Sequence, residues 1–276
     1  MPHRKSEITE EELNDLLVLI KQVYGYDFTG YSKASLLRRF QKVMDDAKMK
    51  TAYDLRFYLT NDRKHFDWFL QTVTVNVTEM FRDPGFYKAV REKVIQRLAT
   101  YPIIKIWHAG CSTGEEVYSM AIVLHEAGLL ERTKIYATDI NPANLEKAKK
   151  GIVPLQQMKD YTFNYQQSGG SRDFADYYTA RYNGALIRKE LRDNIVFAQH
   201  NLVTDGVFNE FQMICCRNVL IYFEKELQNR VISLFEESLS SLGYLALGVK
   251  ESLLFTEVRN KFEAVDLKNK IFRKKQ

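Results

Sequence analysis

The sequence predicts an α/β protein, in which a doubly wound, mostly parallel sheet follows an all-helical N-terminal domain and contains a small inserted β subdomain. Three observations predict this fold class. No strand pattern occurs before Tyr101, apolar strand-like runs alternate with helical stretches after Pro102, and one long connection interrupts that alternation. Strands that alternate with helices form a parallel sheet covered on both faces.

The N-terminal third contains four predicted helices. Thr9 and Glu12 have the spacing of a capping box, and the apolar periodicity that follows them ends at Gly25. A second helix carries apolar residues on one face and basic residues on the other. Thr51 caps a third helix, and the run HFDWFLQTV forms a fourth. We therefore expect a helical domain with its linker over residues 1–85.

The second predicted domain covers residues 86–276. Its expected strands are KIWHAG, KIYATD, NIVFAQHNL, FQMICCRN and GYLALGV, followed by two strands in FEAVDLKNKIFRK around a tight turn at Lys268 and Asn269. Residues 151–194 form too long a connection for a simple loop. They are the predicted inserted subdomain.

Composition narrows the class of protein. The chain has 276 residues, with 45% hydrophobic and 27% charged residues, which is typical of a globular protein. Its three cysteines (Cys111, Cys215 and Cys216) form no CxxC pair, which indicates reduced thiols. The N-terminus has no apolar segment of a signal peptide, and no apolar run approaches the roughly 18 residues of a membrane span. A cytoplasmic monomer is the expectation.

Positive charge is concentrated near the N-terminus. Between Gly30 and Lys64, nine Lys/Arg and four acidic residues leave a net charge of +5. The whole chain also has a formal charge of +5, which is too small to indicate a nucleic-acid partner by itself. This stretch is either a solvated helix face or a surface for an acidic partner.

A glycine turn follows the first predicted strand. The sequence GCSTGEE (110–116) leads from the strand into a helix, which brings backbone N–H groups close to a ligand. Asp139 ends the next strand, where an acid can accept the ribose hydroxyls of a nucleoside. These features leave NAD and S-adenosylmethionine open. Glu115 and Glu116 favour the cationic S-adenosylmethionine, since they would repel a pyrophosphate.

A third candidate segment, TVNVTEMFRDP (74–84), lies before the sheet. Val73, Val75 and Val77 alternate with polar residues, which is typical of a short strand. A purely structural interpretation would make Asn76 a helix cap and Arg82 a surface charge.

Several motifs in order give a more specific indication. The runs NVTEMFRDP (76–84), GCSTGEE (110–116), ATDI (137–140), Asn201-Leu202 and CRNVLIYF (216–223) closely resemble the chemotaxis receptor protein-glutamate O-methyltransferases, the CheR family. The resemblance covers nearly the whole chain. It implies a class I (Rossmann-like) S-adenosylmethionine methyltransferase sheet with a helical receptor-recognition domain before it.

The resemblance also implies residue roles. It implies cofactor contacts at Asn76, Thr78, Arg82, Glu116, Asp139, Asn201, Leu202, Arg217 and Asn218, to which the glycine turn adds Gly110. It places Arg82 and Tyr222 near the transferred methyl group as the catalytic residues, with no metal. Chemoreceptor methylation helices are the implied partner, through the basic residues Lys33, Arg38, Arg39 and Lys42. The run GVKES (248–252) departs from the Gly-His-Ser-Glu-like run of many relatives, so no histidine role carries over there.

The implied reaction transfers a methyl group to a glutamate carboxylate. Such a carboxylate is ionised at neutral pH, so the reaction needs no general base. Two alternatives stay open. One is a methyltransferase acting on another protein or on nucleic acid, although CRNV lacks the Asn/Asp-Pro-Pro-Tyr/Phe run that holds a planar amine. The other is a non-catalytic sensor or scaffold that binds S-adenosylmethionine.

Overall fold

The computed structural model describes residues 8–181 and 184–276 and divides the chain into two compact units. The smaller unit comprises the chain up to Asn76 together with Tyr222–Gln228. The larger unit comprises Val77–Ile221 and Asn229–Gln276. Each unit has its own architecture, and the division cuts through one helix of the sheet domain.

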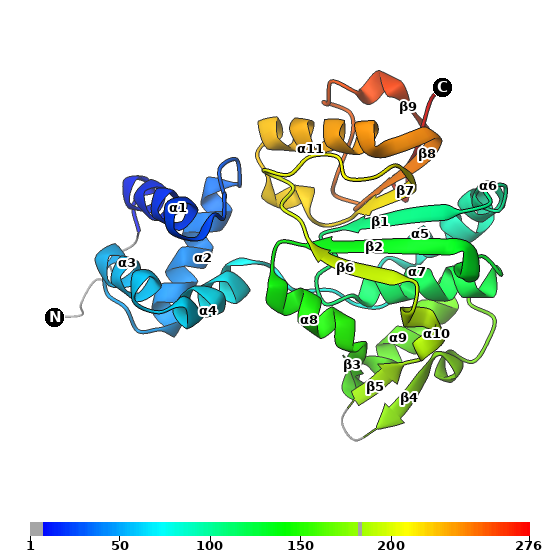
Figure 1. The fold of residues 1–276 in the computed structure, drawn as a ribbon, viewed down its shortest axis with the longest axis horizontal. Coiled ribbons are helices and arrows are strands. Elements are labelled where there is room, and N and C mark those ends of the chain that lie inside the picture. The colour runs from blue at the N-terminus through cyan, green and yellow to red at the C-terminus, as the bar shows by residue number, and fades with distance from the viewer. Residues whose placement is uncertain (1–7, 182–183) are drawn as a thin grey trace. The chain divides into compact units, whose positions relative to one another are not determined.

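The smaller unit is helical, as predicted. Its helices are α1 (Glu10–Tyr24), α2 (Lys33–Asp46), α3 (Ala52–Asn61) and α4 (Arg63–Val73) (Figure 1). The capping box of Thr9 and Glu12 forms, and Gly25 ends α1 in the left-handed conformation that glycine favours. Thr51 caps α3 through the backbone N–H of Asp54. The structure therefore confirms the predicted start and end of α1 and the predicted start of α3.

The four basic residues of α2 differ in their exposure. Lys33, Arg38 and Lys42 are exposed. Arg39 is half-buried, and its Nη1 donates a hydrogen bond to the Val73 carbonyl at 2.7 Å. Arg39 is therefore less exposed than the other three, because the helical turn rotates it toward the end of α4; its contact with a receptor stays a prediction.

The larger unit contains the predicted seven-stranded sheet, in the order β6-β2-β1-β7-β8-β10-β9 (Figure 1). Its strands are β1 (Ile104–Ala109), β2 (Thr133–Asp139), β6 (Ile195–Gln199), β7 (Phe211–Cys216), β8 (Leu239–Leu247), β9 (Phe262–Asp266) and β10 (Ile271–Lys274). The pairs among β6, β2, β1, β7 and β8 are parallel, whereas β10 runs antiparallel to both β8 and β9. The predicted doubly wound sheet with an antiparallel end is confirmed.

Helices cover both faces of this sheet. Trp107 and His108 are neighbours in β1, so their side chains point to opposite faces. The Trp107 ring lies 5.3 Å from the ring of Phe235 in α11 (Lys225–Ser238). His108 contacts Glu116 in α7 (Glu115–Glu126) on the other face. Among the described residues, no helix combines the length and the apolar character needed to cross a lipid bilayer.

Further helices complete the larger unit. These are α5 (Pro84–Ala89), a π-helical segment (Val90–Val94), α6 (Ile95–Leu98) and α8 (Pro142–Lys150). Pro84 stands in the first turn of α5, where its missing N–H removes no helical hydrogen bond.

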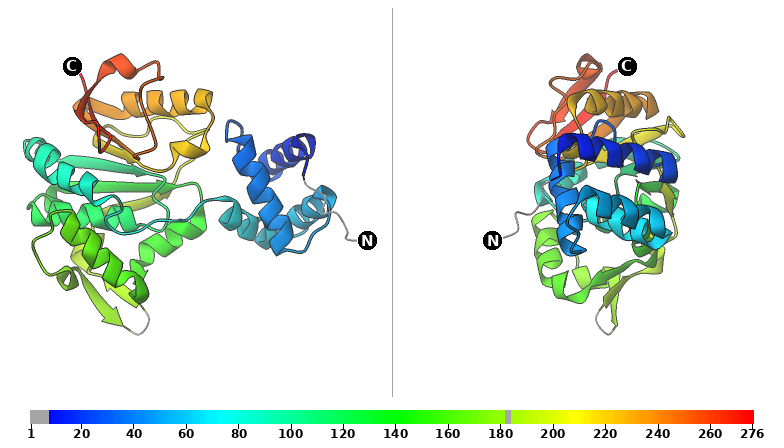
Figure 2. Two further views of the ribbon diagram at one scale, coloured as in Figure 1. Left: turned by 180° about the vertical axis from the view of Figure 1, so that it is seen from behind. Right: turned by 90° about the vertical axis from the view of Figure 1, so that its left-hand side faces the viewer.

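Residues 151–194 form the predicted inserted subdomain, seen as a separate lobe in two views (Figures 1 and 2). It contains β3 (Ile152–Pro154), α9 (Met158–Gln167), β4 (Tyr178–Arg181), β5 (Gly184–Ile187) and α10 (Lys189–Arg192). The three strands pair antiparallel in the order β3-β5-β4. Tyr165 packs its ring 5.2 Å from that of Phe81, which attaches the insert to the segment carrying Arg82.

The short strand predicted from the alternating valines is wrong. Val73 is the last residue of α4, and residues 74–79 have no regular secondary structure. Val75 and Val77 are 39% and 76% exposed. A strand needs a neighbouring strand to satisfy its backbone groups. Within the described part of the chain, no strand pairs with residues 74–79.

Candidate functional site

The glycine turn joins β1 to α7 in a tight backbone conformation. Gly110 and Gly114 have φ of 77° and 95°, and Ser112 between them has φ of 50°. A Cβ atom at Gly110 would lie 2.5 Å from Cγ2 of Val219, so only glycine fits there. The buried hydroxyl of Ser112 has no hydrogen-bond partner within the described chain. A ligand could therefore satisfy it.

Asp139 lies at the end of β2 beside this turn. It is 8% exposed, and its carboxylate accepts hydrogen bonds from the backbone N–H of Ser112 at 2.8 Å and of Asn141 at 2.9 Å. Burial raises the pKa of Asp139, although these two N–H groups oppose the rise. The residue predicted to bind ribose hydroxyls thus also fixes the glycine turn.

A buried ion-pair cluster lies next to the turn, and we call Arg217, Glu116, Asp83 and His108 the Arg217 cluster. The Arg217 side chain is 1% exposed, and its guanidinium binds Glu116 at 2.9 Å and Asp83 at 2.8 Å. Nδ1 of His108 lies 2.9 Å from the other Glu116 oxygen. Burial raises the pKa of Glu116, but the Arg217 charge and His108 outweigh it, so the net shift is downward.

The charges around the turn favour a cationic ligand. Arg217 is one cation between two carboxylates. The buried Glu115 directly follows the glycine turn, and the buried Asp139 accepts a hydrogen bond from Ser112 in that turn. An ammonium or sulfonium group would reduce the excess of acid, whereas a phosphate would increase it. With the unpartnered Ser112 hydroxyl and the tight glycine turn, these residues fit S-adenosylmethionine.

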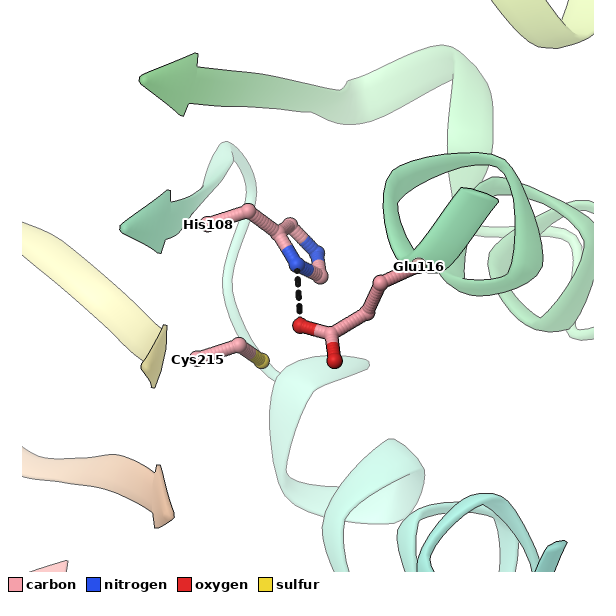
Figure 3. A group of neighbouring side chains, drawn as sticks. All are labelled: His108, Glu116 and Cys215. Carbon is pink, nitrogen blue, oxygen red and sulfur yellow. Dashed lines mark hydrogen bonds and ion pairs between the residues drawn. The ribbon is translucent and has the colours of Figure 1, made fainter. Parts of the chain in front are cut away.

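His108, Glu116 and Cys215 point toward one another from β1, α7 and β7 (Figure 3). Their possible ligand atoms all lie within 4.8 Å of one another, and all three are donor types that metals accept. However, the Arg217 guanidinium lies 2.9 Å from the same carboxylate, which opposes a second cation there. This group of three is better described as the surroundings of the buried Arg217–Glu116 ion pair than as a metal site. No spacing pattern indicated this grouping, since the histidines have no ligand spacing.

Arg82 lies in a constrained loop. The residues on either side of it, Phe81 and Asp83, have φ of 54° and 55°, which is unusual for residues other than glycine. Such backbone strain persists only where surrounding contacts enforce it. Here Phe81 donates its N–H to Ser119 Oγ at 2.9 Å, and the Arg82 carbonyl accepts from Arg217 at 3.3 Å.

The structure brings part of the predicted site together. Gly110, Glu116, Asp139, Arg217 and the backbone of Arg82 are linked by the turn and the cluster described above. Asn201 caps its own loop by accepting from the Val203 N–H, and Leu202 is buried. Thr78 lies half-buried in the irregular segment before Arg82. Asn76 and Tyr222 belong instead to the smaller unit.

Sequence reasoning missed Glu251. This residue is 4% exposed, and its carboxylate accepts hydrogen bonds from the backbone N–H groups of Asn218, Val219, Leu220 and Gly248. It therefore fixes the loop after β7, where Asn218 has φ of 62°. The run GVKES (248–252), which contains Glu251, was notable in the sequence only because it lacks the histidine that many relatives have there.

Comparisons with known proteins match both parts of the chain. The model of the CheR methyltransferase SAM binding domain matches residues 76–271, and that of the CheR methyltransferase all-alpha domain matches residues 11–74. The chain is 51% identical over 266 residues to putative methyltransferase Cher3 of Pseudomonas putida, covering 96% of this chain and 97% of that protein. The chain is 31% identical to the chemotaxis protein methyltransferase of Listeria innocua, covering 86% of this chain and 88% of that protein. It is also 31% identical to the chemotaxis protein methyltransferase of Vibrio parahaemolyticus, covering 94% of each chain.

The fold and the matched domain define an S-adenosylmethionine-dependent methyltransferase. S-adenosylmethionine is its cofactor. Because both domain models match in order and together span most of the chain, the protein belongs to the CheR methyltransferase family.

We expect Asp139→Asn to weaken binding of S-adenosylhomocysteine about 10- to 100-fold, because the substitution turns one of the two acceptor oxygens into an NH2 donor. A backbone N–H or a ribose hydroxyl then loses its acceptor. For the wild type, the raised pKa of Asp139 predicts that affinity falls on acidification already above pH 3.8, the usual value for the group. Calorimetry over a pH series measures both effects. The exposed Asp160→Asn serves as a charge control, and an unchanged affinity in folded Asp139→Asn would remove this residue from the site.

Proposed function

We propose that this protein transfers the methyl group of S-adenosylmethionine to glutamate side chains of chemoreceptors, giving glutamate methyl esters and S-adenosylhomocysteine. The observation that carries the proposal is the similarity, over 86% or more of the chain, to proteins named chemotaxis protein methyltransferase. We propose residues 1–85 as the receptor-recognition domain and its linker, residues 86–276 as the methyltransferase domain, and the cytoplasm as the location.

Bound S-adenosylmethionine supplies an electrophilic methyl group. The attacking carboxylate oxygen forms a bond to that carbon while the bond to sulfur breaks, so no proton has to be removed. The protein's contribution is alignment, which is worth roughly 7–11 kcal/mol in well-oriented intramolecular reactions. In this proposal Arg82 orients the carboxylate by its charge, and Tyr222 orients it by a neutral hydrogen bond that weakens the nucleophile less.

Methylation of a chemoreceptor cytoplasmic fragment with labelled S-adenosylmethionine tests the proposal. We expect label on the wild-type fragment, release of that label as methanol in mild base, and no label when the accepting glutamates are replaced by glutamine. Base-stable label would indicate an amine or another acceptor. If S-adenosylhomocysteine binds but no fragment is labelled, the non-catalytic scaffold is the better description.

Charge reversal on α2 should weaken receptor binding and leave the cofactor unaffected. Arg38→Glu with Lys42→Glu changes two exposed cations that face the solvent, whereas methylation helices carry acidic glutamates. We expect a higher KM for the receptor fragment, an unchanged affinity for S-adenosylhomocysteine, and a similar rise in KM for the wild type in added salt, since exposed charges are screened over about 8 Å. Equal kinetics in all three conditions would assign recognition to another surface, such as the insert.

A further inference from the structure

The segment that carries Tyr222 packs against the helical unit. The Tyr222 carbonyl accepts from the Ser32 N–H at 2.8 Å, and the Glu224 N–H donates to the Gly30 carbonyl at 2.7 Å. Phe223 forms a β-bridge with Tyr31, and their rings lie 4.8 Å apart. Residues Tyr222–Gln228 thus belong to the smaller unit, although α11 continues beyond them in the larger one.

Arg39 completes this contact through the side chain of Tyr222. Its guanidinium carbon lies 4.5 Å from the centre of the Tyr222 ring, a cation–π geometry. The same guanidinium donates to the Val73 carbonyl at 2.7 Å. Arg39 is therefore held between the end of α4 and the Tyr222 ring. The hydrogen bond to Val73 fixes the guanidinium, and the guanidinium in turn limits where the ring can lie.

We propose that Arg39 is a positioning residue for Tyr222, a role that rests on the proposed function of Tyr222 in orienting the carboxylate. Arg39 contacts the face of the Tyr222 ring, and the position of the ring determines where its hydroxyl lies. The helical domain then has two tasks on one helix. Lys33, Arg38 and Lys42 on the exposed face of α2 meet the receptor, and Arg39 on its inner face holds the catalytic tyrosine.

Kinetics of Arg39→Leu test this role against a purely structural one. We expect kcat for receptor methylation to fall about 10- to 100-fold, the loss typical of a displaced catalytic group, with unchanged affinity for S-adenosylhomocysteine. Arg39→Lys keeps the cation but not the planar fork, so it should recover part of kcat. The matched control is Arg63→Leu, which removes an arginine 5.1 Å from the Tyr24 ring in the same unit and should leave kcat unchanged.

A second background separates an action through Tyr222 from general damage. In Tyr222→Leu, which has no ring for Arg39 to hold, the added Arg39→Leu should lower kcat no further. In Tyr222→Phe, which keeps the ring face, Arg39→Leu should still move the ring but cost little further kcat. A full loss in the Tyr222→Leu background, or a normal kcat in Arg39→Leu alone, would overturn the proposal.

Fluorine NMR provides a readout that does not depend on turnover. In protein labelled with 3-fluorotyrosine, the Tyr222 resonance is assigned by its disappearance in Tyr222→Phe. We expect this resonance to shift and broaden in Arg39→Leu but not in Arg63→Leu. If it does not move, Arg39 does not position the ring. If the wild type transfers no methyl group to carboxylates, the proposed function fails, and this spectrum still reports on the Arg39 contact alone.

Discussion

Glu251→Ala is expected to lower the free energy of unfolding of the larger unit by about 3 kcal/mol or more, since each buried donor left unsatisfied costs roughly 1–3 kcal/mol. The wild-type carboxylate accepts from four backbone N–H groups, at Asn218, Val219, Leu220 and Gly248. Alanine leaves all four without an acceptor in a buried site, and each unsatisfied group is costly. Asn218 should then move, and affinity for S-adenosylhomocysteine should fall as well.

Fluorescence of Trp107 during urea unfolding measures this loss. The sequence has two tryptophans, and Trp107 is fully buried in the larger unit. In a Trp68→Phe background the signal therefore reports on that unit alone. Glu257→Ala, an exposed glutamate in the same loop, should change stability little, and Glu251→Gln should be intermediate because one amide oxygen remains to accept. Equal stability of Glu251→Ala and Glu257→Ala would contradict the assigned role.

Arg217→Met should also destabilise the larger unit by about 3–5 kcal/mol near neutral pH, because it leaves the Glu116 carboxylate buried without its cation. The ion pair with Asp83 contributes less to this loss, since the Asp83 side chain is 33% exposed and solvent screens its charge. The guanidinium also lies 4.1 Å from the centre of the Phe86 ring, and methionine keeps some of this packing. Cofactor affinity should also fall, since Glu116, which Arg217 binds, lies next to the glycine turn.

The pH dependence distinguishes a lost charge from lost packing. The wild-type pKa of Glu116 is lowered from its usual 4.5, so this ion pair contributes stability above that pH and loses it as the pH falls through the folded-state pKa. In Arg217→Met, burial without the arginine favours a raised pKa of Glu116, so the gap between wild type and variant should begin to narrow above pH 4.5 and continue to narrow below it. Urea unfolding at several pH values, with the exposed Arg230→Met as a control, measures the gap. A gap that is constant with pH would indicate that packing alone is lost.

Local patterns in the sequence determined the elements and much of the turn. The capping residues Thr9 and Thr51 act within three positions, and the alternation of apolar strands with helices reflects burial that each strand experiences on both faces. The glycine turn and Asp139 followed from the same kind of local rule, since a strand end and a helix start lie together in any such sheet. The valine alternation before Arg82 misled because periodicity does not reveal whether a partner strand exists.

The tertiary structure alone decided which distant groups meet. Arg217 lies 101 residues from Glu116 in the chain, and Glu251 lies 31 residues from Leu220, so no local pattern relates them. The same holds for Arg39, whose contact with the Tyr222 ring joins residues far apart in the chain. Secondary structure depends on hydrogen bonds and side-chain periodicity within a few residues. A buried charge, in contrast, is defined by its partner, and only the packing of the whole chain supplies that partner.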